Sequence, residues 1–230
     1  MVFGGIKNER IQFNEDTVWQ GAPHDYANTG AHEHLGEIRR LLWDGKQSEA
    51  EELAMKRFMS DPLRQKAYQA FGDLTLELLN VDESSVSGYR RDLNLDTAIA
   101  SVQFEAGNTQ YKREVFASFP EKAIVVRLTV TGDELLSFRA SLVSARPGAS
   151  VKPLGDDLVM AGKVADSAIR FEARVAVQTD GKLEHDEGSI LVRSATSATL
   201  LLAGATNFIN YRDVSGNPGE RNARTLGLVR

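Results

Sequence analysis

The 230-residue sequence predicts a mainly β protein, a β-sandwich that carries one helical insertion near its beginning. Two observations lead to this fold class. Between residues 68 and 210, apolar and polar residues alternate in segment after segment, which is typical of half-buried strands. Between residues 30 and 60 the apolar spacing is that of a helix. A parallel α/β fold would need helices between the strands, and the sequence shows none there, so the strands are expected to pair as a sandwich.

The alternating segments give about ten strands, the number and spacing expected of a sandwich. Two turn signals, Gly107-Asn108 and Asp180-Gly181, separate neighbouring segments. The stretch 144–157 is rich in turn-forming residues and is expected to be a loop. The expected strands centre on residues 10–13, 74–78, 98–104, 111–116, 124–130, 138–142, 169–177, 190–192 and 200–202.

The helical insertion at about 30–60 has the pattern of a hairpin of two helices. Gly45 is expected to end the first helix. Ser48 followed by Glu51 has the spacing of a capping box and is expected to start the second. We expect the hairpin to lie on a sheet. The apolar stripes of the two helices are Leu35, Ile38, Leu41 and Leu42, and Ala50, Leu53, Ala54 and Phe58.

Composition and charge argue against several classes of partner. The 27 basic and 32 acidic residues are interspersed and give a net charge of -5, so nucleic acid is not an expected partner. No apolar run reaches the ~20 residues that span a bilayer, so no membrane partner is expected either. The sequence has no cysteine, hence no disulfide. His32 and His34 stand two apart where a helix should start, a spacing that points them to different faces, so we expect no metal site and no cofactor.

The candidate site residues begin with a loop rich in Asn, Asp and Gly after the first strand: Asn14, Glu15, Asp16, Thr17 and Trp19. Adjacent carboxylates on an extended chain point to opposite sides, so Glu15 and Asp16 are a poor catalytic pair. One interpretation is that Asn14, Asp16 and Thr17 hold the loop through hydrogen bonds to the backbone. The other is that the loop projects toward a sugar site on a neighbouring domain, where Trp19 stacks on a sugar or fills an interface.

A second candidate is the connector between the helical insertion and the first long strand, where Tyr68 and Gln69 precede Gly72. These two residues could line a domain junction. The connector could equally be a plain strand-entry turn in which Gly72 supplies the flexibility.

Six segments together carry a resemblance to a known family. They are FGGIKNERIQFNEDTVWQG, HEHLGEIRRLLWDGKQSEAEELA, YQAFGDLTLEL, YRRDLNLDTA, YKREVFASFPEKAIVVRL and TNFINYRDVSGNP. Nearly end to end, over residues 1–218, the sequence resembles the N-terminal domain of glycoside hydrolase family 95. The Asn14-to-Thr17 element with Trp19, followed by the Phe-Gly-Asp-Leu element, is the most specific part.

The resemblance implies a β-supersandwich, a galactose-mutarotase-like sandwich, at the start of a large enzyme. In that family a helical linker, an (α/α)6 barrel and a C-terminal β domain follow. Such enzymes remove terminal α-L-fucose with inversion, and their catalytic residues lie in the barrel. The chain itself is therefore expected to have no catalytic residue and to be inactive alone. Its expected partners are the barrel, as a packing partner, and fucosylated oligosaccharides only through the full-length enzyme.

Two departures from the family pattern carry further expectations. The family has one more strand before the Met-Val-x-Gly-Gly stretch, so the first strand is expected to be missing here. The pattern is lost after Gly219, and residues 219–230 are expected to form an irregular tail. The N-terminal residues have no basic head followed by a long apolar region, so they are not expected to be a signal peptide. Because upstream sequence is expected to be missing, the compartment stays open between secreted or periplasmic and cytoplasmic.

A different class of function is a stand-alone carbohydrate-binding β-sandwich. It would use Trp19, Tyr26, Trp43 and Tyr68 as sugar platforms, which requires several exposed aromatics on one face. A structural or interaction domain without a sugar role is the third alternative.

Overall fold

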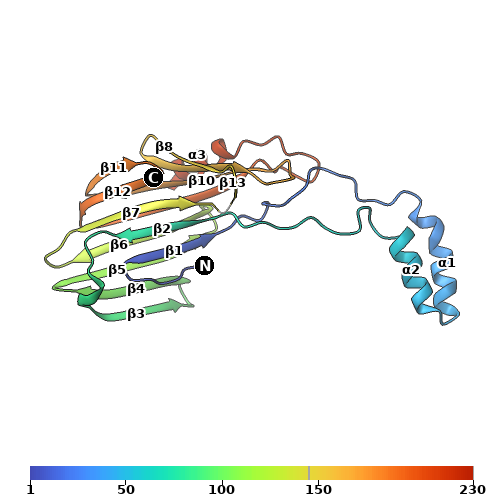
Figure 1. Ribbon diagram of the computed structural model, residues 1–230, viewed down its shortest axis with the longest axis horizontal. Coiled ribbons are helices and arrows are strands. Elements are labelled where there is room, and N and C mark those ends of the chain that lie inside the picture. The colour runs from blue at the N-terminus through green and yellow to red at the C-terminus, as the bar shows by residue number, and fades with distance from the viewer. Residues whose placement is uncertain (145, 230) are drawn as a thin grey trace.

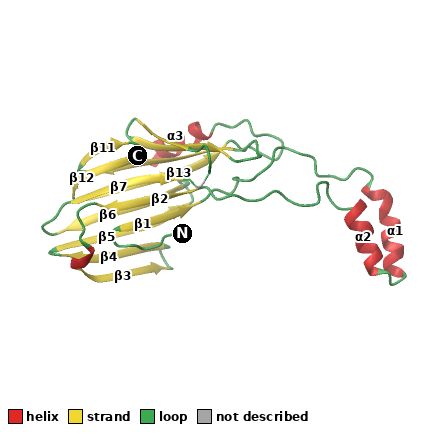
Figure 2. Cartoon of the chain, in the orientation of Figure 1, coloured by secondary structure: helices red, strands yellow, loops and turns green. Residues whose placement is uncertain are grey.

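Two antiparallel sheets stacked face to face make up most of the computed structural model, which describes residues 1–144 and 146–229 (Figure 1). The smaller sheet has five strands in the order β1-β2-β7-β12-β11, and the larger has eight in the order β3-β4-β5-β6-β13-β10-β9-β8. Figure 2 shows the strands as one sandwich and the helices apart from it or on its outside. The predicted fold class, a mainly β sandwich with a helical hairpin, is confirmed.

The strands of the smaller sheet are β1 (Asn8–Phe13), β2 (Gly72–Leu78), β7 (Leu136–Val143), β12 (Ser189–Ala195) and β11 (Lys182–Asp186). Those of the larger sheet are β3 (Val86–Asn94), β4 (Ile99–Ala106), β5 (Thr109–Ser118), β6 (Ala123–Thr131), β13 (Ser197–Thr206), β10 (Arg170–Thr179), β9 (Asp157–Lys163) and β8 (Ser150–Leu154). The helices are α1 (Ala31–Trp43), α2 (Gln47–Arg57) and α3 (Pro218–Val229), with a short 3-10 turn, η1 (Glu83–Ser85).

The core lies between the sheets and follows the alternation in the sequence. Leu74, Leu76 and Leu78 of β2 are buried, as are Phe171 and Val175 of β10 in the larger sheet. Each such side chain contributes roughly 1.5–3 kcal/mol by leaving water. Because a shift of one residue in pairing would turn these side chains toward solvent, the apolar pattern also fixes the register.

Four observed strands, β3, β8, β9 and β11, fall outside the expected segments. Three of them, β3, β8 and β11, are the edge strands of their sheets, and their side chains are mostly exposed. A strand exposed on both faces shows no alternation that a sequence pattern can detect. The fourth, β9, buries Leu158 and Met160, but this pair is too short to stand out beside the preceding stretch of turn-forming residues.

Both helices of the insertion are present, and their apolar stripes pack against each other, with Ile38 and Ala50 buried. Gly45 ends the first helix as expected: it has a φ of +75°, and the N–H groups of Gly45 and Lys46 donate to the carbonyls of Leu42 and Leu41 at 3.1 and 2.8 Å. This is the left-handed helix end that favours glycine.

Two expectations about the insertion are wrong. Ser48 does not cap the second helix, because the tight turn at Gly45 already returns the chain to helical geometry and α2 begins at Gln47. The hairpin also does not lie on a sheet. It projects from one end of the sandwich on two long extended segments (Figures 1 and 2). Ile38 and Ala50, which were expected to face a sheet, are buried between the two helices instead, while Leu42 and Phe58 of the same stripes are exposed.

The expectation of an irregular tail at 219–230 is wrong as well. Residues Pro218–Val229 form α3, which packs outside β10 and β13 with Leu226 buried against Leu201 and Ala203. Asn217 caps the helix by accepting hydrogen bonds from the N–H groups of Gly219 (3.0 Å) and Glu220 (3.3 Å). The segment has two glycines and few apolar residues, so its pattern does not predict a helix. Asn, Pro and Glu at these spacings are nevertheless a helix start signal.

The N-terminal residues pair with the free edge of β1. Val2 forms an antiparallel bridge with Ile11, and the N–H of Gln12 donates to the carbonyl of Met1 at 2.9 Å. Among the described residues, no helix has the length and apolar character that crossing a membrane requires.

Candidate functional site

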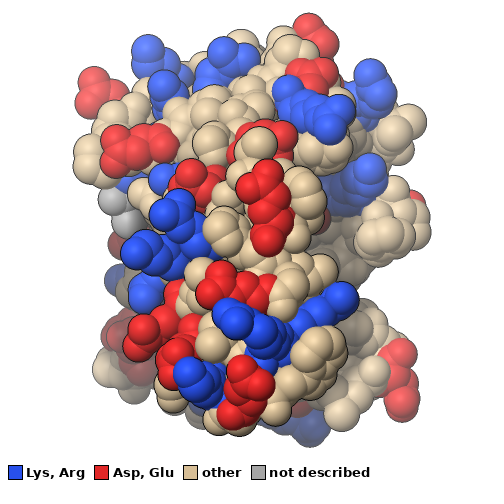
Figure 3. Space-filling model, turned by 90° about the vertical axis from the view of Figure 1, so that its right-hand side faces the viewer, with Lys and Arg blue, Asp and Glu red and all other residues tan. Residues whose placement is uncertain are grey.

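Four segments far apart in sequence meet at the end of the sandwich from which the hairpin projects. They are residues 14–26, 66–70, 164–169 and 207–216. Backbone hydrogen bonds join the first three, and the side chain of Asn207 donates to the carbonyl of Ala168. We name this region the loop end. Figure 3 views the molecule from the hairpin side and shows acidic and basic side chains interspersed over the face in view, with no broad patch of one sign.

The two predicted candidates, the loop after the first strand and the connector before β2, lie side by side at the loop end. Trp19 and Tyr68 form a β-bridge, and their ring centroids are 5.1 Å apart. The Tyr68 hydroxyl donates to the carbonyl of Glu15 at 2.9 Å. The indole Nε1 of Trp19 donates to the carbonyl of Asp16 at 2.8 Å. Each aromatic ring therefore anchors the loop that carries the carboxylates.

The Glu15 carboxylate holds the loop from inside. Its Oε2 accepts hydrogen bonds from the backbone N–H of Thr17 (2.8 Å) and from the Thr17 hydroxyl (2.6 Å). That hydroxyl is also hydrogen-bonded to the hydroxyl of Thr206 at the end of β13. The Oδ1 of Asn14 accepts from the N–H of Glu15 at 3.0 Å. Glu15, rather than Asp16, thus supports Thr17, and the loop is tied to a strand 189 positions away in sequence.

Gln69 lies at the other side of the connector. Its Oε1 accepts from Nη2 of Arg146 at 3.1 Å, and the same guanidinium donates to the carbonyl of Ala70. The N–H of Gln69 donates to the carbonyl of Val18 at 2.8 Å. Gln69 is therefore fixed within the fold, beside the candidate site rather than facing it.

Burial raises the pKa of Glu15 above its ordinary value of 4.5, and the nearby Asp16 carboxylate adds to the rise, while the hydrogen bonds from Thr17 oppose it. A carboxyl whose folded-state pKa is raised binds its proton more tightly when folded. Its stabilising contribution is complete below the unfolded pKa and is lost as pH rises through the folded pKa.

We therefore expect Glu15→Gln, which keeps an oxygen for Thr17, to be slightly more stable than the parent at pH 7 and equal to it near pH 4. The gain should stay under about 1 kcal/mol, because a partly exposed carboxylate keeps much of its hydration. Urea unfolding of both proteins between pH 4 and pH 8 measures it. A variant that is less stable at pH 7 than at pH 4, relative to the parent, would contradict the expected sign.

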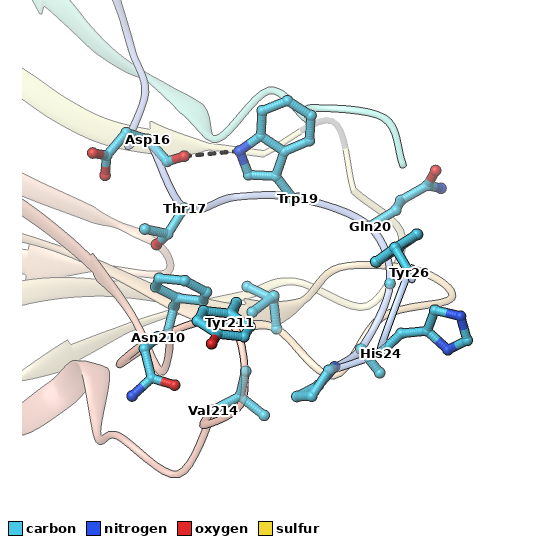
Figure 4. A pocket seen from close by; sticks show the side chains of 14 residues that line it. Asp16, Thr17, Trp19, Gln20, His24, Tyr26, Asn210, Tyr211 and Val214 are labelled. Carbon is cyan, nitrogen blue, oxygen red and sulfur yellow. Dashed lines mark hydrogen bonds between the residues drawn. The ribbon is translucent and has the colours of Figure 1, made fainter. Parts of the chain in front are cut away.

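A cavity of about 340 Å³ opens between the N-terminal loop and the loop after β13 (Figure 4). Asp16, Thr17 and Trp19 reach it from the first loop, while Asn210 and Tyr211 reach it from the second (Figure 4). Its lining is Asp16, Thr17, Trp19, Gln20, Gly21, Ala22, Pro23, His24, Tyr26, Ile169, Phe208, Asn210, Tyr211 and Val214.

The sequence pattern missed the second wall, which Phe208, Asn210, Tyr211 and Val214 supply. These residues lie in the TNFINYRDVSGNP segment, which resembles the family but to which the sequence assigns no functional residue. The signal was a run of aromatic and amide residues directly after a buried strand. Only the sheet order, which returns β13 to the middle of the larger sheet, shows that this run faces residues 14–26.

The four aromatics of the carbohydrate-binding alternative do not form one platform. Trp19 and Tyr68 contact each other, and Tyr26 packs edge-on against His24 at 4.7 Å. Trp43 lies on α1, away from the sandwich (Figure 1). Over residues 1–144 and 146–229, no three His, Asp or Glu side chains gather as a metal site.

The fold and this loop end define a class: a two-sheet β-sandwich domain with a cavity between the loops at one end. Residues 1–211 match the sequence model of the family described as "Glycosyl hydrolase family 65, N-terminal domain". The chain belongs to this family of glycoside hydrolase N-terminal domains, and the predicted resemblance is confirmed at this level.

Three curated relatives give the same class of protein. The chain is 30% identical to "Alpha-L-fucosidase 2" of Arabidopsis thaliana over 90% of its length and 27% of that protein. It is 25% identical to "Probable alpha-fucosidase A" of Aspergillus niger, over 79% of the chain and 23% of the relative. It is 22% identical to the protein of the same name from Aspergillus oryzae, over 90% of the chain and 30% of that relative. The chain thus spans about a quarter of the length of these relatives.

Proposed function

We propose that this chain is the non-catalytic N-terminal domain of an α-L-fucosidase-like enzyme of glycoside hydrolase family 95, which hydrolyses terminal α-L-fucosides with inversion. One observation carries the proposal: 90% of the chain is similar to a protein named alpha-L-fucosidase 2, yet covers only 27% of it. The two fungal relatives with α-fucosidase names support the same substrate class.

The chemistry of the cavity supports a non-catalytic role. Inverting hydrolysis needs two carboxyl groups roughly 6.5–9.5 Å apart, with room for a water between them. Among the residues that line the cavity, Asp16 alone carries a carboxylate. The carboxylate of Glu15 is engaged by Thr17. The acid and the base of the reaction are therefore assigned to the rest of the full-length enzyme, where fucosylated oligosaccharides are hydrolysed.

The hairpin supports a packing role for the chain. Leu42, Trp43 and Met55 are 52%, 81% and 53% exposed, although α1 and α2 already pack against each other. Exposed apolar side chains on a projecting element mark an interaction surface. In this proposal they pack against the helical barrel of the full-length enzyme, which holds the loop end beside the catalytic centre.

We expect the purified chain to release no 4-nitrophenol from 4-nitrophenyl α-L-fucoside above the buffer rate. A turnover above about one per minute, far below the ~10 per second that is usual for enzymes, would already contradict a non-catalytic domain. The positive arm is to sequence the DNA on both sides of the coding segment, express any longer frame found there, and assay the product. A longer product that hydrolyses other glycosides but leaves α-L-fucosides intact would overturn the substrate class.

A further inference from the structure

The cavity at the loop end has the size of a small-molecule site. Its volume of about 340 Å³ lies within the roughly 300–1,000 Å³ usual for ligand pockets, at the lower end that suits one sugar ring. Both walls are fixed by hydrogen bonds in the fold. Thr17 is bonded to Thr206 on one side, and the Asn207 side chain donates to the carbonyl of Val214 at 2.6 Å on the other. The cavity is therefore formed before any ligand enters.

The lining is rich in aromatic side chains. Trp, Tyr and Phe make up 7% of the chain, but four of the 14 residues that line the cavity. They are Trp19, Tyr26, Phe208 and Tyr211. Tyr211 is 67% exposed, and the guanidinium of Arg212 lies over its ring at 5.0 Å, which leaves the other face of the ring for a ligand. Aromatic faces offer a large apolar contact area to the C–H face of a ring.

Polar groups lie beside these rings. Asp16 and Asn210 line the cavity from opposite walls, and Gln20 and His24 lie farther along the N-terminal loop (Figure 4). The Oδ1 of Asn210 also accepts a hydrogen bond from the N–H of Arg212. A carboxylate accepts and a carboxamide both accepts and donates, so together they match the hydroxyl groups of a sugar. Ile169, Phe208 and Val214 add an apolar part that would suit a methyl substituent.

We infer that this cavity is a subsite for one sugar ring with an apolar edge, a 6-deoxyhexose such as L-fucose. The choice of sugar rests on the proposed function, while the binding itself rests on the cavity. Tyr211 and Trp19 supply the packing surface, and Asp16 and Asn210 the hydrogen bonds.

The two tryptophans of the chain permit a direct test. In Trp43→Phe, the indole of Trp19 at the cavity is the only one left. Titration with methyl α-L-fucoside should change its fluorescence saturably, with a Kd in the millimolar range, about 1–10 mM. Saturation-transfer NMR on the unmodified chain provides a second readout that does not depend on tryptophan. Adding Tyr211→Ala should raise the Kd at least tenfold.

Matched controls separate the cavity from the rest of the surface. Trp19→Phe keeps only Trp43, on the projecting hairpin, and should show no fluorescence change. Phe119→Ala removes a ring that is 90% exposed in the turn between β5 and β6 and should leave the Kd unchanged. Thermal unfolding of each variant verifies that the fold is kept.

Each other outcome overturns the inference in a defined way. If neither readout detects binding up to about 50 mM, well beyond the weakest affinity expected, the cavity is no sugar site and is left as a seat for an apolar side chain of the rest of the enzyme. If methyl α-D-glucoside binds equally well, the 6-deoxyhexose assignment is wrong. Neither result touches the proposed function, which fails instead if the chain hydrolyses the fucoside or the longer product does not.

Discussion

Replacing Arg113 by methionine should destabilise the chain by about 3–5 kcal/mol, because it leaves the carboxylate of Glu9 buried without its partner. Arg113 on β5 and Glu9 on β1 link the two sheets, and their side chains are 3% and 0% exposed. The Nη2 of Arg113 lies 2.5 Å from Oε2 of Glu9 and also donates to the carbonyl of Gly5 at 2.5 Å.

Glu9 in turn fixes the N-terminal segment. Its Oε1 accepts hydrogen bonds from the N–H groups of Phe3 (3.1 Å), Gly4 (2.9 Å) and Arg10 (3.0 Å). Burial lowers the pKa of Arg113, and the nearby Glu9 carboxylate opposes that change. The loss of either one exposes the other to the full cost of a buried charge.

Urea unfolding measures this prediction, and the neighbouring residue supplies the control. Lys112 on the same strand pairs with Glu114 at 2.8 Å, but their side chains are 45% and 29% exposed. Lys112→Met should cost less than about 1 kcal/mol, as exposed pairs do. The double variant Glu9→Gln, Arg113→Met leaves no buried charge and should be more stable than Arg113→Met alone. Equal losses for Arg113→Met and Lys112→Met would contradict the role of the buried pair.

The sequence predicts those parts of the fold in which one face of a strand or helix is buried, because burial of one face produces a periodic pattern of apolar residues. The three leucines of β2 (Gly72–Leu78) alternate because one face of the strand is in the core. The helical stripes of α1 and α2 are visible for the same reason. An apolar stripe does not show which surface it packs against, however, and the stripes of α1 and α2 pack against each other rather than on a sheet.

Most of the elements that the sequence did not predict bury few apolar side chains. The edge strands β3, β8 and β11 are held by backbone pairing, which leaves no trace in side-chain type. In α3, one buried leucine and one capping asparagine, Leu226 and Asn217, decide the packing and the start. The capping residues at the start of α3 can be recognised in the sequence, whereas the surface that α3 covers follows only from the order of the strands in the sheet.

The candidate site divides in the same way. Trp19 and its neighbours stand out by composition, since Asn, Asp and Thr after a strand are typical of an ordered loop. The other wall lies about 190 positions later, and no local property of Asn210 or Tyr211 marks it as the neighbour of Trp19. Contacts at such separations follow from topology, which a single sequence does not state.

Replacing Asn207 by alanine should destabilise the chain by about 2–4 kcal/mol, because it removes three buried hydrogen bonds at once and leaves their partners unpaired. Asn207 is 1% exposed. Its Oδ1 accepts from the N–H of Arg170 at 2.8 Å, and its Nδ2 donates to the carbonyls of Ala168 (3.1 Å) and Val214 (2.6 Å). The side chain thus joins the segment before β10 to the loop that forms the second wall of the cavity.

The local consequence should be as clear as the global one. With Asn207 removed, the loop at 207–216 loses its inner anchor, and we expect faster amide exchange at Gly216, whose N–H donates to the carbonyl of Asn207 at 3.0 Å. Asn210→Ala is the control in the same loop: its side chain is exposed and accepts from the N–H of Arg212, so it should cost under about 0.5 kcal/mol. If Asn207→Ala unfolds at the same urea concentration as Asn210→Ala, the Asn207 side chain does not hold the second wall. That outcome would contradict a cavity whose shape is fixed by side-chain hydrogen bonds.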